Sequence, residues 1–298
     1  MKRAWFTYAL VTTLFWGVWG AFAEFPTRHG FPDTLVYVVW TLTMIPPALY
    51  AMQRVGWRVQ RNGKSVLLGS LIGFTGAGGQ MLLFHAVHTG PTYLIFPVIA
   101  LSPVVTIGLS MVFLRERVTR VGAFGVLLAL VALPLFNYSP AGDAAAVQGV
   151  TWFIFALIVL LAWGVQGYFM KLANASMDAE NIFLYMAVWS LLLIPIALWM
   201  TDFSNPINYG WQGPGLAAVT QILNAVGALT LVYAFRYGRA LVVAPLANAG
   251  APMITAIVSM IVLGVMPSSV TIVAIALAFL AAALLAIEPE DKLVEQPV

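Results

Sequence analysis

The sequence predicts an all-α integral membrane protein of ten transmembrane helices, arranged as two inverted repeats of five. Hydrophobic residues make up 61% of the 298 residues and charged residues only 8%, with a mean hydropathy of +0.93. A soluble domain carries about 25% charged residues, so this composition excludes a soluble fold. The apolar residues also fall into separate stretches, each close to the roughly 20 residues that a helix needs to cross a bilayer.

The expected spans follow one another with short polar connections. In the first half they cover Trp5–Ala23, Thr34–Met52, Ser65–Val87, Thr92–Leu114 and Val121–Tyr138. In the second half they cover Val150–Phe169, Ile182–Thr201, Leu216–Phe235, Ala240–Leu263 and Val270–Ile287. The first apolar run is full length and a second follows closely, so we expect a retained helix and no cleaved signal peptide.

The second half of the chain repeats the first. Trp-Gly-Val-Trp-Gly at residues 16–20 returns as Trp-Gly-Val-Gln-Gly at residues 163–167, an offset of 147, and Pro97 returns as Pro245, an offset of 148. Because five spans are an odd number, the second copy enters the membrane from the opposite side, which is the plan of many secondary transporters. The expected units are residues 1–140, residues 147–290 and a tail at residues 291–298.

The basic residues fix an expected orientation. With ten spans, thirteen of the 14 Lys and Arg residues fall on one face of the membrane and only Arg28 falls on the other. The positive-inside rule then places both termini in the cytoplasm of a multi-pass protein of the cytoplasmic (inner) membrane. This placement explains the net charge of +3 without nucleic-acid binding. The absence of cysteine excludes disulfides, thiolate metal sites and a catalytic thiol.

The fourth span carries motifs of a known family. Gly-Pro-Thr-Tyr-Leu-Ile-Phe-Pro at residues 90–97 runs into Leu-Ser-Pro at 101–103, and Arg-Glu-Arg-Val-Thr at 115–119 closes the span. With the repeated Trp-Gly pair, these features resemble the drug/metabolite transporter (DMT) superfamily, and its EamA-type branch in particular. One departure is Gly-Val-Met-Pro at 264–267, where the acidic motif would recur. The resemblance implies alternating access to a central cavity lined by the first, third, fourth, sixth, eighth and ninth spans.

Polar and aromatic side chains within the spans are the candidates for substrate binding. A buried amide normally faces a partner helix or a water-filled cavity, so substrate contact and interhelical bonding are both open. Aromatic rings beside amide donors would suit a sugar ring or an aromatic metabolite. The candidates are Trp16, Trp19, Gln80, His85, Tyr93, Trp163, Gln166, Gln221, Asn224, Tyr233 and Asn248.

Prolines at matching places in the two halves are candidate hinges or helix breaks. A proline frees a backbone carbonyl, which a membrane tolerates only where another group satisfies it. The four residues are Pro97, Pro103, Pro245 and Pro252. A packing kink without a role in transport is the alternative interpretation.

Ionisable residues limit the substrate. No Asp or Glu is expected at the centre of the bilayer, which argues against antiport of cationic drugs. His85 with Glu24 is a candidate outer protonation site; a hydrogen-bonded histidine at a helix end is the alternative. Lys171 and Arg236 at the cytoplasmic mouth would attract an anionic substrate, unless they only follow the orientation rule. No metal site is predicted.

The sequence therefore predicts a secondary transporter of a small polar organic metabolite, such as a sugar, an amino acid or a related acid. The chain lacks an ATP-binding motif, which argues against a primary pump unless a partner supplies the motif, and no cofactor is expected. The alternatives are a proton-coupled exporter of cationic drugs and an intramembrane enzyme, which would need a catalytic set that we do not find. The expected partners are the substrate and the lipid bilayer, with proton coupling left open, and the duplication within one chain favours a monomer.

Overall fold

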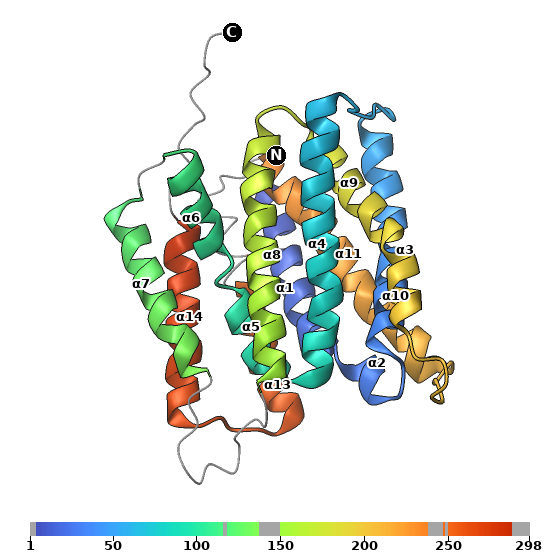
Figure 1. Cartoon of the computed structure of the whole chain (residues 1–298), viewed down its shortest axis with the longest axis vertical. Helices are drawn as coiled ribbons and strands as arrows, with labels where there is room; N and C mark the ends of the chain where they lie inside the picture. The colour runs from blue at the N-terminus through green and yellow to red at the C-terminus, as the bar shows by residue number, and fades with distance from the viewer. Residues whose placement is uncertain (1–3, 116–117, 137–149, 238–246, 248–249, 288–298) are drawn as a thin grey trace.

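The computed structural model describes residues 4–115, 118–136, 150–237, 247 and 250–287, and all regular structure in these ranges is helical. Figure 1 shows a bundle whose long helices run along its length. The helices of the first half are α1 (Ala4–Phe22), α2 (Phe25–Arg28), α3 (Asp33–Arg54), α4 (Gly63–Thr89), α5 (Thr92–Ile99), α6 (Pro103–Phe113) and α7 (Arg120–Leu135). Those of the second half are α8 (Thr151–Asn174), α9 (Ala179–Leu192), α10 (Ile194–Met200), η1 (Trp211–Gly215), α11 (Leu216–Tyr237), α13 (Ala251–Leu263) and α14 (Ser269–Ala286).

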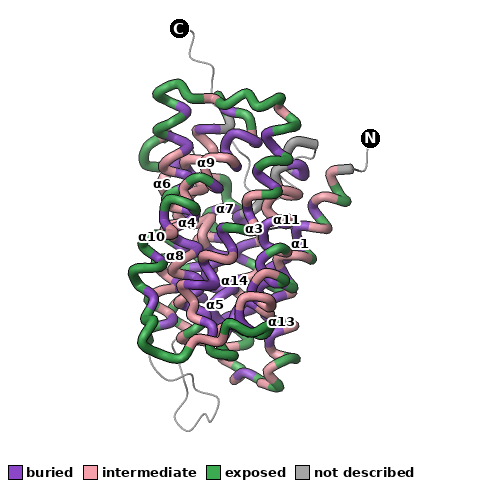
Figure 2. The backbone as a smooth tube through the Cα atoms, turned by 90° about the vertical axis from the view of Figure 1, so that its right-hand side faces the viewer, coloured by how far each residue is buried: buried purple, intermediate pink, exposed green. Residues whose placement is uncertain are grey.

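Within the described residues, seven helical segments are long and apolar enough to cross a membrane, and three shorter apolar helices join them. The shorter ones are Arg120–Leu135, Ala251–Leu263 and Ser269–Leu285. The predicted all-helical membrane fold is therefore confirmed, while the count of ten spans stays a prediction. Large apolar side chains such as Val112, Phe113 and Ile261 point outward, as lipid-facing residues do. Figure 2 shows exposed segments around a buried interior.

The two halves use the same local signals to begin equivalent helices. Thr119 caps α7 by accepting a hydrogen bond from the backbone N–H of Gly122 at 3.2 Å. Ser268 caps α14 in the same way, accepting from the N–H of Thr271 at 3.2 Å. A hydroxyl at the N-cap satisfies a donor that has no partner within the helix. The two caps lie 149 positions apart, close to the offset of the repeat.

Helices of one repeat pack against the other in matched pairs. The contact between α1 and α11 has its counterpart between α8 and α4, and that between α1 and α13 in the pair α8 and α6. Likewise, the contact between α3 and α11 is matched by α9 with α4. The equivalent helices α7 and α14 pack on each other at one edge of the bundle (Figure 1). This pattern is the one expected of two repeats related by a pseudo-two-fold axis.

Two polar contacts join the repeats at opposite ends of α3. After α3, the Asn181 side chain accepts from the Gln60 N–H at 2.9 Å and donates to the Arg58 carbonyl at 3.1 Å. Before α3, Asn208 donates from its backbone to the Gly30 carbonyl at 3.1 Å and from its side chain to the His29 carbonyl at 2.9 Å. We call these the Asn181 contact and the Asn208 contact. Gln60 and Asn208 differ by 148 positions, so they are equivalent in the repeat.

The predicted helix breaks are found in part. The fourth apolar segment divides into α5 and α6, and Pro103 is the first residue of α6. Pro97 lies inside α5 instead of at its end. Pro252 is the second residue of α13. Gly250 before it already has helical backbone angles, and Pro245 lies outside the described residues, so helix breaks at Pro245 and Pro252 stay predictions.

Candidate functional site

The repeated Trp-Gly motif brings the first helix of each half into close contact with the other half. A Cβ on Gly17 would come within 2.6 Å of the Ile254 side chain, so only glycine permits this approach of α1 to α13. Thr255 fixes the contact by donating a hydrogen bond from its hydroxyl to the Gly17 carbonyl at 3.0 Å. Close approach through small residues and hydroxyl bonds is typical of helix packing in membranes.

The second repeat reproduces this contact between α8 and α6. A Cβ on Gly164 would come within 2.7 Å of the Ser102 carbonyl oxygen and would collide with Val105. Thr106 donates from its hydroxyl to the Gly164 carbonyl at 2.8 Å. The offsets are 147 between the glycines and 149 between the threonines, so each contact is the equivalent of the other.

The predicted candidates Trp16 and Trp163 occupy equivalent places on a second interface. Trp16 packs on Gly227 of α11 and donates its indole N–H to the backbone carbonyl of Asn224 at 3.1 Å. Trp163 packs on Gly79 of α4 and donates to the carbonyl of Gly76 at 3.4 Å. Both tryptophans therefore act as structural contacts between the repeats.

The two interfaces differ in their polar side chains. Between α1 and α11, the buried Trp19 donates its indole N–H to Oε1 of Gln221 at 2.9 Å. Gln221 is fully buried and Asn224 is only 6% exposed, yet neither side-chain NH2 group has a hydrogen-bond partner among the residues that the structure describes. The Trp19 ring also meets the edge of Phe96 at a centroid distance of 5.6 Å. Two buried amide donors therefore lie beside aromatic rings.

At the other interface, between α8 and α4, the equivalent positions carry different residues. Gly73 and Gly76 stand where Gln221 and Asn224 stand in the second repeat, each at an offset of 148. Gln166 replaces Trp19 and packs against Gly76, where a Cβ would collide with its amide. The two amides of α11 thus have no counterpart on α4 at these positions.

The remaining aromatic and amide candidates are buried in other places. Gln80 on α4 is 5% exposed, and its NH2 group also has no partner within the described ranges. Tyr93 on α5 is buried in the apolar core. Tyr233 is buried on α11, with its ring 5.6 Å from that of Tyr8 and 6.5 Å from that of Tyr50. All three therefore lie in the interior of the bundle, and their role in substrate binding stays a prediction.

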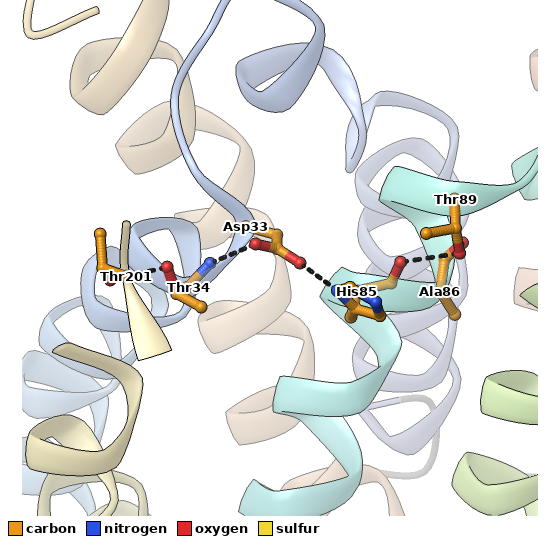
Figure 3. A network of polar contacts seen from close by, with 6 residues as sticks. All are labelled: Asp33, Thr34, His85, Ala86, Thr89 and Thr201. Carbon is orange, nitrogen blue, oxygen red and sulfur yellow. Dashed lines mark hydrogen bonds and ion pairs between the residues drawn. The ribbon is translucent and has the colours of Figure 1, made fainter. Parts of the chain in front are cut away.

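His85 takes part in a polar network near the end of α4 (Figure 3). Its Nδ1 lies 2.8 Å from a carboxylate oxygen of Asp33, the first residue of α3. The other oxygen of Asp33 accepts from the Thr34 N–H at 2.9 Å, and the Thr34 and Thr201 hydroxyls are 2.7 Å apart. The side chain of His85 is 40% exposed and that of Asp33 is 15% exposed, so protons and water can reach the pair.

His85 and Glu24, predicted as a pair, contact different residues. Glu24 lies 2.9 Å from Arg28, four residues later in the chain, while His85 pairs with Asp33. Asp33 was not among the site residues predicted from the sequence. Its position at the start of a helix, just after Pro32, could have indicated that it lies at the same end of the bundle as His85, since α4 ends only four residues after His85.

Three other predicted site residues are only partly described. Lys171 lies in the last turn of α8, half-buried. Arg236 belongs to α11, but its side chain is outside the described part, and Asn248 falls outside the described residues altogether. Their expected roles at the cytoplasmic mouth and in the ninth span stay predictions.

Comparison with known proteins points to one family. The sequence model of the EamA-like transporter family matches residues 3–138 and again residues 150–287. An uncharacterized protein of Methanocaldococcus jannaschii is 30% identical over 61 residues, a match that covers 20% of this chain and 44% of the relative. One crystal structure superposes with a TM-score of 0.61 at 18% identity, over 93% of this chain and 95% of that one, which shows the likeness of the folds.

Proposed function

Since the chain belongs to the EamA-like transporter family, whose members are transporters and not enzymes, we propose that it is a secondary active transporter of the cytoplasmic membrane. It moves a small polar organic metabolite, such as a sugar, an amino acid or a related acid, by alternating access. The protein is a multi-pass membrane protein, and we place both of its termini in the cytoplasm. The two repeats form the pathway within one chain, so a monomer is the working unit.

The observation that carries this proposal is the pair of buried amides, Gln221 and Asn224, beside Trp16 and Trp19. A polar group without a hydrogen bond in an apolar interior is costly, and such groups inside membrane proteins mark substrate pathways. Two N–H donors with aromatic walls suit the oxygens and the carbon skeleton of a small metabolite.

We assign proton coupling to the His85 and Asp33 pair. An imidazole ring can take up and release a proton at its nitrogens, and the Asp33 carboxylate lies within hydrogen-bond distance of Nδ1. Among the described side chains, the neighbours of His85 are Asp33 on α3, His88 on α4 and the Phe155 ring of α8 at 4.5 Å. Gain and loss of a proton at this pair would make and break a link between α3 and α4.

The test begins with a thermal-shift screen of the purified protein against sugars, sugar acids, amino acids, nucleosides and quaternary ammonium compounds. A solute that binds only the native state raises the melting temperature by mass action. We expect stabilisation by a neutral or anionic metabolite and saturable uptake of that solute into proteoliposomes. Stabilisation by lipophilic cations alone would instead favour a drug exporter and contradict the proposed substrate class.

The same proteoliposomes test the coupling. We expect a pH gradient to accelerate uptake by the unaltered protein, and His85→Gln to remove this acceleration while solute exchange continues. His29→Gln is a matched control, because His29 is exposed and, among the described residues, its ring hydrogen-bonds to the Phe25 carbonyl of its own segment. Acceleration that persists in His85→Gln would remove this residue from the coupling mechanism.

A further inference from the structure

We propose that Gln221 and Asn224 bind a carboxylate group of the transported solute through their two side-chain NH2 groups. This inference rests on the proposed transport function and narrows its substrate class. It makes the solute a small organic acid, in preference to a neutral polyol or a cation. Four observations support it: the orientation of one amide, the position of the other, the comparison of the two repeats and the charges around the site.

The orientation of the Gln221 amide is fixed by its neighbour. An indole nitrogen can only donate a hydrogen bond, so the atom that Trp19 contacts at 2.9 Å must be the amide oxygen. The NH2 group of Gln221 therefore points away from Trp19. It is fully buried and has no hydrogen-bond partner in the described part of the chain. The side chain consequently offers two N–H donors and an oxygen that is already occupied.

Asn224 adds a second donor on the same side of the helix. It follows Gln221 by three residues, and side chains with this spacing are neighbours on one face of a helix. Its NH2 group is also buried and has no partner among the described residues. The indole N–H groups of Trp16 and Trp19 are both engaged, by the Asn224 carbonyl and by Gln221, so these rings contribute apolar surface beside the donors.

The comparison of the repeats shows that packing does not require these amides. The equivalent interface, between α8 and α4, keeps the tryptophan, the glycine beneath it and the indole bond to a backbone carbonyl. It carries Gly73 and Gly76 at the two amide positions. Two buried amides that the fold can do without, and that find no partner within its described part, are best explained by a ligand.

The surrounding charge decides which ligand fits. No Asp, Glu, Lys or Arg occurs in residues 4–23, 92–114 or 216–235, the segments that supply Trp19, Phe96 and the two amides. An ammonium group here would face N–H donors and find no carboxylate, so a cation is disfavoured. A carboxylate offers two acceptor oxygens to two donors, and hydrogen bonds to an ionised acceptor are roughly twice as strong as those between neutral groups. The donors therefore favour an organic acid.

The test compares solutes that differ in one group. Lactate with lactamide, gluconate with glucitol, and 4-hydroxybenzoate with 4-hydroxybenzamide are added to the purified protein in a thermal-shift titration. We expect at least one acid to raise the melting temperature. Its neutral counterpart should need at least a tenfold higher concentration to produce the same rise. Equal effects of both members of every pair, or no effect of any acid, would overturn the carboxylate assignment.

Variants locate the effect at the two amides. Asn224→Leu keeps a similar shape without the donor and should weaken binding of the stabilising acid by about tenfold or more. Gln221→Glu keeps an oxygen that accepts from Trp19 and puts a second carboxylate oxygen in place of the NH2 group. It should therefore abolish the rise in melting temperature with the acid at pH 8, while the protein stays folded. Thr220→Val is the control, because among the described residues the Thr220 hydroxyl bonds only to carbonyls of its own helix. Unchanged binding in both amide variants would overturn the proposal.

The outcomes separate this inference from the proposed function. If a neutral solute such as glucitol is bound and taken up into proteoliposomes, and Asn224→Leu abolishes that uptake, the protein is a transporter and only the carboxylate assignment fails. If an acid binds at the amides but no solute that binds is ever transported, the binding site stands and the transport function fails.

Discussion

The interfaces of α1 with α11 and of α8 with α4 are built on the same backbone contacts and carry different chemistry. In both, a tryptophan packs on a glycine of the facing helix and donates to a backbone carbonyl. Only the first of them holds an adjacent pair of buried amides without partners among the described residues, at Gln221 and Asn224. The shared contacts determine how the repeats pack, so the side chains between them are free to differ, and the polar site is not symmetric.

The largest expected effect tests whether the shared contacts are equivalent. Gly17→Val and Gly164→Val should each lower the free energy of unfolding by about 3 kcal/mol or more, since the new side chain meets another helix that cannot move away. Melting temperature and size-exclusion profile of the purified variants measure this. Gly78→Val is the control, because nothing lies within 4 Å of a Cβ at that position. If only one of the two variants is destabilised, the two glycine contacts are not equivalent.

A smaller effect is expected at the two ends of α3, where the repeat-equivalent contacts differ in burial. Asn181→Ala removes two hydrogen bonds from a fully buried side chain and should cost about 2 kcal/mol. Asn208→Ala also removes two side-chain bonds, one to the His29 carbonyl and one from the Gly210 N–H, but from a half-buried position where water can replace them, and should cost about 1 kcal/mol or less. Denaturant or thermal unfolding of both variants under one condition gives the ranking. The reverse order would mean that burial does not govern the strength of these contacts.

The threonine bonds sharpen the comparison further. Thr106→Val deletes the bond to the Gly164 carbonyl, and Thr255→Val deletes the bond to the Gly17 carbonyl with its longer contact of 3.5 Å to the Trp16 carbonyl; both preserve the shape of the side chain. Such bonds contribute about 0.6 kcal/mol in membrane proteins, so each variant should be slightly and equally destabilised. The melting temperatures of the two single variants and of the double variant test this, with additive losses expected because the threonines lie in separate interfaces. A clear difference between the single variants would show that one interface bears more of the stability.

The sequence predicted the repeat architecture of this fold more readily than the partners of its polar side chains. The Trp-Gly repeat predicted the duplication and the equivalent positions of the two halves, because a repeated anchor is a signal that one sequence carries alone. It also selected Gln221 and Asn224, since amides are rare inside apolar spans. It did not find Asp33 beside His85, or Asn181 beside Gln60, because these pairs are far apart in the chain and only the packing of α3 with α4 and α9 brings them together. Ion pairs and loop contacts depend on tertiary geometry that periodicity does not encode.

The smallest expected effect concerns the loop that carries the Asn208 contact. The Ser204 hydroxyl and N–H, together with the Asn205 amide, donate hydrogen bonds to Asp202 and lower the pKa of its carboxyl. A lowered pKa means that this stabilisation is complete above the carboxyl's unfolded pKa and is lost as the pH falls through the lower folded value. The melting temperature of the unaltered protein should therefore exceed that of Asp202→Asn at neutral pH by a small margin, because the carboxyl is fully exposed, and this margin should shrink on acidification. A margin that is unchanged in acid would contradict the assignment of this stabilisation to the Asp202 carboxyl.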